Sequence, residues 1–374
     1  MSWMIATALA GCSVTGYLFF RYTWCLSLGL PAKIIVFALF MLLGCLPLLV
    51  GYNHEKALGG FYSFYRYALY FVFIFCVILF TITLLSDAVF GILCYATPWL
   101  RHMTYVGCWW FKYGNIVLAL LFSVYALYAG TKVPDTKEVV LSSDKISAPQ
   151  KIVLLSDIHV HRVISPDKVR GIVEKTNALE PDVILLAGDI IDDNVARVHD
   201  ISLLLKGLRA KNGIYFVTGN HEFYAGYRET VAELKKLGFT FLENNGAALP
   251  GNIYVGGVAD VRTAGHLGIK IDIEKTFAEA KPGQYRILMS HTPADFEKKN
   301  NFDLEVSGHT HGGQIFPFHI LAKWYNRYLA GQYNITNNAK IYVSRGAGQW
   351  GPQMRFLAPS EITLINLLPE TQEK

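Results

Sequence analysis

Charged residues are nearly absent from the first third of this 374-residue chain. Residues 1–130 hold only eight of them, although the chain has 34 Lys and Arg and 29 Asp and Glu. Charged residues make up 17% of the sequence, below the roughly 25% of an ordinary soluble domain. A shortage confined to one end excludes a single soluble domain, a disordered chain and a fibrous repeat.

Cysteine is missing from the other two thirds, because all six cysteines lie before residue 109. Residues 131–374 therefore cannot contain a cysteine nucleophile, a thiolate zinc site or a disulfide scaffold. Most of the net charge of +5 also belongs to the first 130 residues, so the remainder is nearly neutral. A neutral remainder offers no broad basic field for DNA or RNA, and we expect no nucleic-acid partner.

Apolar sequence dominates the first third. Four charge-free runs cover residues 1–20, 34–53, 67–86 and 113–131. About 20 helical residues cross a hydrocarbon core of ~30 Å, so residues 1–131 are predicted to be a membrane region with about four transmembrane helices. A fifth run, residues 88–100, either extends the third helix or lies in the interface. Basic residues flank both sides equally, which leaves the orientation of this integral, multi-pass protein open.

An α/β pattern follows a polar linker expected at residues 132–150. Short apolar runs predict six strands, at 152–155, 183–186, 214–217, 253–258, 287–289 and 341–343. One helical pattern begins at Ser165-Pro166, and a second, over residues 228–237, ends at Gly238, a natural C-cap. Strands that alternate with helices indicate a layered α/β domain over residues 151–374.

Polar side chains follow five of the apolar runs where each strand is expected to end. They are Asp157 and His159, Asp189, Asn220 and His221, His291, and His309 and His311. Ligand sites of α/β sheets lie at the carboxyl ends of strands, and buried Asp and His there need a compensating charge. Oxygen and imidazole ligands without sulfur suit Mn, Fe or Zn. This many candidate ligands exceeds the needs of one ion and fits two divalent ions about 3.5–4 Å apart that share a carboxylate.

These motifs together resemble the signature of the calcineurin-like metallophosphoesterase family, in its bacterial membrane-associated branch. The match covers about residues 150–367 and includes Asp157-x-His159, Gly188-Asp189, Gly219-Asn220-His221-Glu222, His291 and Gly308-His309-x-His311. The fourth residue of the Gly-Asn-His motif is Glu here, where the family commonly has Asp. The resemblance implies a layered α/β/β/α sandwich and two bound metal ions.

The resemblance also implies a role for each residue. Asp157, His159 and His311 would hold the first metal, Asn220, His291 and His309 the second, and Asp189 would bridge both. His221 would contact the phosphate or protonate the leaving oxygen.

Several neighbouring polar residues leave alternatives open. Arg162 and Arg345 are candidate substrate contacts, although a solvated loop and a carboxylate partner explain them as well. Asp192 and Asp193 are interpreted as the start of a helix. His199 has no partner that the sequence reveals.

The expected function is a membrane-anchored hydrolase of phosphoesters or pyrophosphates, with a lipid-linked phosphate as one candidate substrate. The alternative is a metal-binding, non-catalytic scaffold in a membrane complex, which would be expected to have lost ligands. The apolar segment 315–329 either approaches the bilayer or belongs to ordinary core or a cap over the site.

Overall fold

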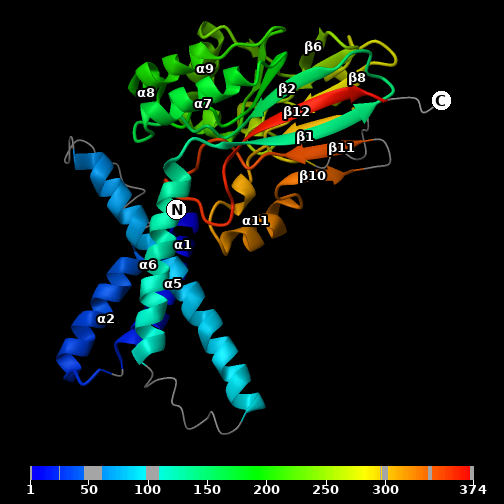
Figure 1. Ribbon diagram of the computed structural model, residues 1–374. Helices are drawn as coiled ribbons and strands as arrows, with labels where there is room; N and C mark the ends of the chain where they lie inside the picture. Colours follow the sequence, from blue (N-terminus) through cyan, green and yellow to red (C-terminus); the bar gives the residue numbers. More distant parts are fainter. Residues whose placement is uncertain are drawn as a thin grey trace. The chain divides into compact units, whose positions relative to one another are not determined.

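The computed structural model describes residues 2–24, 26–45, 61–97, 109–294, 296, 302–335 and 339–370 (Figure 1). The chain forms two compact units. The first comprises residues 1–128 with 351–354, and the second comprises residues 129–350 with 355–374.

Apolar helices make up the first unit. They are α1 (Ser2–Tyr22), α2 (Leu30–Gly44), α5 (Tyr62–Ala96) and α6 (Trp109–Thr131). Two segments, Tyr62–Ala96 and Lys112–Thr131, are long and apolar enough to cross a bilayer. Helix α2 has only 15 residues, and residues 46–53 of the predicted second span lie outside the described residues. Because α5 continues to Ala96, the fifth apolar run extends the third helix.

A polar contact joins two of these helices. Arg21 of α1 donates to Asp87 of α5 at 2.6 Å, and the hydroxyl of Tyr17 donates to the same carboxylate. Charges within apolar helices are costly unless they are paired, so this contact offsets the burial of Asp87.

The second unit contains two six-stranded sheets. The first has the order β1 (Asp135–Ser143), β12 (Glu361–Pro369), β2 (Gln150–Leu155), β3 (Val183–Ala187), β4 (Ile214–Val217) and β5 (Thr240–Phe241). Its strands are parallel except for the antiparallel pair β12–β2. Strand β1 lies inside the segment expected to be a linker, 132–150. Its exposed polar residues resemble a loop, and only pairing with the distant β12 makes them a strand.

The second sheet has the order β10 (Gly331–Asn334), β11 (Lys340–Val343), β9 (Leu304–Ser307), β8 (Tyr285–Met289), β7 (Ile253–Gly257) and β6 (Asn245–Leu249). Its four central strands are parallel, and both edge strands pair antiparallel. All six strands predicted from apolar runs are present in the two sheets.

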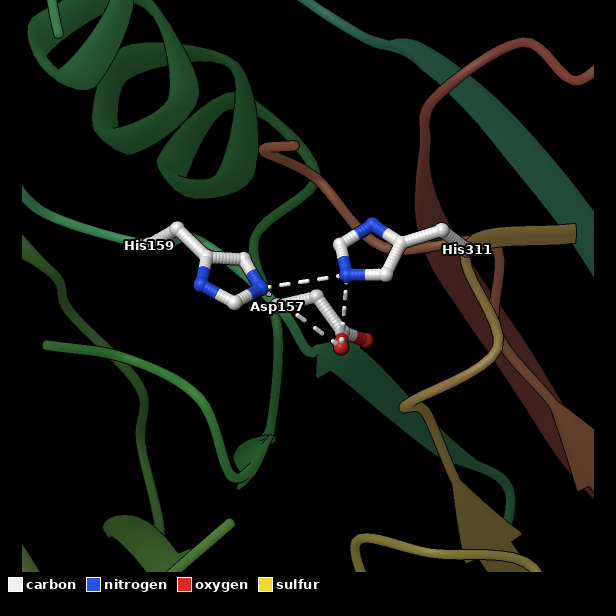
Figure 2. Close-up of side chains that lie close together, drawn as sticks. All are labelled: Asp157, His159 and His311. Carbon is white, nitrogen blue, oxygen red and sulfur yellow. Dashed lines mark hydrogen bonds and ion pairs between the residues drawn. The ribbon is translucent and has the colours of Figure 1, made fainter. Parts of the chain in front are cut away.

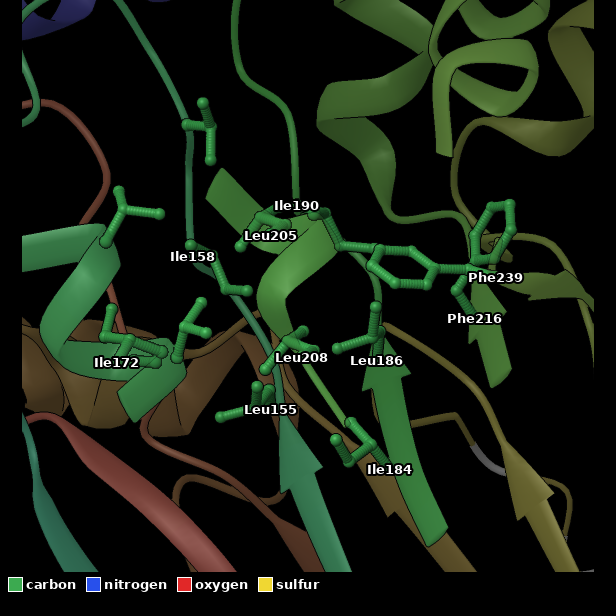
Figure 3. Close-up of a cluster of buried hydrophobic side chains, with 14 of the residues drawn as sticks. Leu155, Ile158, Ile172, Ile184, Leu186, Ile190, Leu205, Leu208, Phe216 and Phe239 are labelled. Atoms are coloured by element: carbon green, nitrogen blue, oxygen red, sulfur yellow. The ribbon is translucent and has the colours of Figure 1, made fainter. Parts of the chain in front are cut away.

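Successive side chains of a strand point to opposite faces of the sheet, so each sheet packs against a different layer on each face. Ile152 and Leu154 of β2 share a buried cluster with Val255 and Ile287 of the second sheet, so the two sheets pack face to face. The opposite face of β2 packs beneath α7 (Pro166–Ala178), α8 (Val195–Ser202) and α9 (Asn220–Lys236). Figure 3 shows this second cluster, in which Leu155 lies near Ile172 of α7. The outer face of the second sheet buries Leu288 with Ile273 of the short α10 (Ile273–Thr276).

Helix α9 begins earlier than its apolar pattern indicates. It starts at Asn220, directly after β4, and is interrupted at Gly226, where φ is 116°. The break separates a first turn that carries Asn220, His221 and Glu222 from the amphipathic part of the helix. This first turn contributes directly to the site described next.

Candidate metal centre

The structure brings together all eight residues that the strand-end pattern identified. They follow β2, β3, β4, β8 and β9, strands from both sheets whose carboxyl ends converge. Five of them adopt left-handed backbone angles that non-glycine residues seldom use, namely Asp157, His159, Asp189, His309 and His311, with φ between 51° and 68°. Such conformations cost about 1–3 kcal/mol each and persist where surrounding structure imposes them, which is typical of a functional site.

Asp157, His159 and His311 form the first group of side chains that could hold a metal ion (Figure 2). The Nε2 atom of His311 lies 3.3 Å from Oδ1 of Asp157 and 3.1 Å from Nε2 of His159. All three side chains are buried. Gly308 leaves room for this group, since a side-chain carbon there would collide with Oδ2 of Asp157.

Asp189, His291 and His309 form a second group. Nε2 of His291 lies 3.1 Å from Oδ2 of Asp189, and Asn220 Oδ1 lies 2.9 Å from Nδ1 of His309. The same Asp189 Oδ2 is 3.7 Å from Nε2 of His159 in the first group. Asp189 therefore lies between the two groups.

The orientation of His291 fits a metal ion. Its Nδ1 donates to the carbonyl oxygen of Ala187 at 2.8 Å, so Nε2 is the ring nitrogen that faces Asp189. This buried Nε2 has no hydrogen-bond partner among the described residues. Burial alone would lower the pKa of His291, but Asp189 raises it to about 10, so the contact between this nitrogen and the carboxylate favours a positive charge, which a divalent ion would supply.

Two of the histidines are held in the neutral form that binds metals. Burial, followed by the charge of His291, lowers the pKa of His309 to about 3. Burial and the neighbouring His159 place the pKa of His311 well below its usual range. The site therefore offers imidazole, carboxylate and amide donors, a set suited to divalent ions such as Mn, Fe or Zn.

His221 is oriented by a residue that sequence reasoning interpreted differently. Nδ1 of His221 hydrogen-bonds to the carboxylate of Asp192, while its Nε2 lies 4.0 Å from Oδ2 of Asp189. Burial alone would lower the pKa of His221, but Asp189 and then Asp192 raise it to about 9. The prediction that Asp192 starts a helix is wrong, because α8 begins at Val195 and Asn194 is its N-cap.

The Glu222 side chain connects the loop after β3 with the loop after β4, and both loops carry candidate metal ligands. Its carboxylate oxygens accept backbone N–H groups from Gly219 at 2.7 Å, Asp189 at 3.0 Å, Ile190 at 2.7 Å and Ile191 at 3.0 Å. Burial and the charge of Asp189 raise the pKa of Glu222 to about 7, while the bonds from Ile191 and Gly219 oppose that shift. The residue that departs from the common family motif thus holds the β3 and β4 loops together.

We expect Glu222→Gln to destabilise the chain by at least about 2 kcal/mol. Glutamine keeps one acceptor oxygen, so two of the four buried N–H groups lose their partner, at about 1–3 kcal/mol each. Thermal and urea unfolding of the full chain in detergent would measure the change. Glu229→Gln is the matched control, because Glu229 is an exposed glutamate of the same helix. Equal stability of the two variants would contradict the clamping role.

The two candidate substrate arginines both have carboxylate partners. Arg162 donates to Asp193 at 2.7 Å, and Arg345 donates to Glu361 at 2.9 Å. Arg345 also lines a cavity of about 330 Å³ next to Gly312, one residue beyond His311. His199, which the sequence left without a partner, contacts Glu233 at 2.7 Å.

The sequence analysis did not identify two arginines that lie at the site. Arg262, after β7, places Nη1 2.9 Å from Nε2 of His309. Arg355 is fully buried and donates to the carbonyl oxygens of His311 at 3.0 Å and Arg345 at 2.8 Å. Arg262 follows a predicted strand, so extending the strand-end argument to β7 would have found it. Arg355 lies in a long loop, where no pattern marks it.

Comparisons with known proteins identify the family. A family model described as Calcineurin-like phosphoesterase matches residues 150–313. A Helicobacter pylori (strain J99) protein named as a metallophosphoesterase is 39% identical over 248 residues, which cover 66% of this chain and 67% of that protein.

More distant relatives carry similar names. A Bacillus subtilis metallophosphoesterase is 32% identical and covers 65% of this chain and 88% of its own length. A zebrafish (Danio rerio) protein named "transmembrane protein with metallophosphoesterase domain" is 31% identical, covering 67% of this chain and 61% of its own length. The Helicobacter pylori protein is similar to this chain over about two thirds of both sequences, which assigns the chain to its family. The chain is a phosphoesterase hydrolase that belongs to the calcineurin-like metallophosphoesterase family.

Proposed function

We propose that this chain is a membrane-anchored hydrolase of phosphoesters or pyrophosphates that uses two divalent metal ions. The observation that carries the proposal is the placement of Asp189 between two groups of buried metal-binding side chains. A single structural ion would need only one of these groups.

Each side chain has a role in this proposal. Asp157, His159 and His311 would hold one ion, Asn220, His291 and His309 would hold the other, and Asp189 would be shared. When bound, the ions supply Lewis acidity for the phosphoryl group and for the attacking water.

His221 acts on the substrate rather than on the metals. Asp192 fixes its ring through Nδ1, so Nε2 is directed toward the site. A charged imidazole in this position can donate a hydrogen bond to a phosphoryl oxygen or a proton to the leaving oxygen.

The first unit is proposed to anchor the enzyme in a membrane as a multi-pass region over residues 1–131. Two of its helices have spanning length, and relatives from zebrafish and cattle are named transmembrane proteins. We further propose residues 132–150 as the connection and 151–374 as the catalytic domain. A lipid-linked phosphate is the narrower form of the substrate proposal, since such an anchor keeps the enzyme at the bilayer.

Metal-dependent turnover separates this function from the non-catalytic scaffold. The purified full chain in detergent is stripped with a chelator, reloaded with Mn²⁺, and assayed with bis-p-nitrophenyl phosphate and p-nitrophenyl phosphate. We expect hydrolysis to disappear on stripping and to return on reloading. A reloaded protein that contains two metal equivalents and hydrolyses neither ester would favour the scaffold.

A further inference from the structure

Helix α11 (Phe318–Asn326) exposes an apolar surface. The relative exposure of Ile320 is 60%, of Leu321 62%, of Trp324 84% and of Tyr325 68%. None of the nine residues of this helix is buried. Contiguous apolar surface of this kind marks an interaction site in a soluble domain.

The segment around α11 carries charge of one sign. Residues 306–360 contain five Lys and Arg and no Asp or Glu. Arg345 pairs with Glu361 and Arg355 is buried, so the basic residues of this segment that can lie near a lipid surface are Lys323, Arg327 and Lys340. Lys323 lies within the helix and Arg327 is its C-cap. An apolar helix with aromatic and basic residues is complementary to an anionic lipid surface.

Contacts within the second unit fix α11 next to the metal centre. Arg262 stacks on the ring of Tyr325 at 4.5 Å, donates to Asn326 at 2.6 Å and contacts His309 at 2.9 Å. His319 and Lys323 also line the cavity beside Gly312. Helix α11 is orange in Figure 1. Its Tyr325 and Asn326 thus contact Arg262 beside His309, while Ile320, Leu321 and Trp324 are exposed.

We propose that α11 lies in the interface of an anionic bilayer, with Ile320, Leu321 and Trp324 inserted below the lipid headgroups. The proposal rests on the membrane attachment proposed above and is independent of hydrolysis. Nine residues would bind lipid weakly on their own. However, only residues 132–134 separate α6 from β1, so attachment keeps the local lipid concentration high. Basic residues around the helix favour lipid over an apolar protein partner, because lipid phosphates match their charge.

Quenching by brominated lipids tests the position of Trp324. The full chain and its Trp324→Phe variant are placed in nanodiscs of phosphatidylcholine and phosphatidylglycerol, with plain or dibrominated acyl chains. The difference between the two proteins isolates the emission of Trp324 from that of the other six tryptophans. We expect brominated chains to reduce this difference at least twofold. Leu203→Trp, at an exposed apolar residue beside α8, provides a control probe that should not be quenched.

Each outcome has a defined meaning. A chain that does not incorporate into nanodiscs contradicts the membrane attachment itself. Incorporation with Trp324 emission unchanged by bromine and open to iodide would overturn the docking of α11. Protection from iodide without bromine quenching would indicate a second copy on this surface, and would overturn it as well. Equal quenching in discs of phosphatidylcholine alone would overturn the requirement for anionic lipid.

Discussion

Replacing Asp189 with Asn is expected to remove bound metal and lower kcat/KM more than about 100-fold. Changes in the outer shell of metal sites already cost 10–100-fold, and Asp189 lies between both groups of proposed ligands. Asparagine has nearly the same size but no charge, and its amide nitrogen cannot bind a cation. The loss should therefore reflect charge and coordination rather than packing.

Metal analysis and kinetics on the same preparation measure this effect. We expect the wild-type chain to retain two equivalents of Mn²⁺ after gel filtration and the Asp189→Asn variant fewer than one. Asp167→Asn is the matched control, because Asp167 is an exposed aspartate in the first turn of α7. If Asp189→Asn kept two metals and normal turnover, Asp189 would not be a shared ligand.

Replacing His221 with Ala is expected to keep the metals and lower kcat by about 10²–10⁴-fold, the range for loss of a general acid or base. The structure makes this a demanding test, because His221 also belongs to a third group that could hold a metal, together with His159 and Asp189. The bond from Nδ1 to Asp192 favours the substrate role. A loss of metal equivalents in His221→Ala would instead identify His221 as a ligand.

Asp192→Asn distinguishes orientation from chemistry. The hydrogen bond to His221 weakens but the imidazole remains, so we expect a smaller fall in kcat than for His221→Ala. Because Asp192 acts through His221, adding Asp192→Asn to His221→Ala should cost little more. Additive losses would mean that Asp192 acts elsewhere, for example through His159, whose Nδ1 lies 3.4 Å from it.

Local patterns were sufficient for the six apolar strands and for the residues that follow strand ends. Apolar runs such as Val183–Ala187 have few structural alternatives, and parallel strands bring their carboxyl ends to one edge. Asp157, Asp189 and His291 could therefore be placed in one site without coordinates. Their individual roles as ligands remain predictions, to be decided by the metal analyses above.

Local composition also identifies helices of membrane-spanning length, but only for part of the first third of the chain. Apolar composition alone identified α5 and α6 as long enough to cross a bilayer. Among the described residues, only the segments in α5 and α6 are long and apolar enough to cross a bilayer by themselves. The arrangement of residues 1–131 as four spans therefore remains a proposal.

The remaining features depend on contacts between residues far apart in the sequence. Asp192 resembles a helix start until the fold brings it against His221, and Glu222 resembles a conservative replacement until its carboxylate meets four backbone N–H groups. Strand β1 has a loop-like sequence and becomes a strand by pairing with β12.

The sequence by itself determined which polar residues follow the strand ends and that the first third is apolar, because periodicity and composition are properties of neighbouring residues. Only the tertiary structure decided which carboxylate orients His221, which arginines contact the metal loops, and that α11 turns its apolar residues outward. These depend on geometry between distant segments, and no local pattern records that geometry.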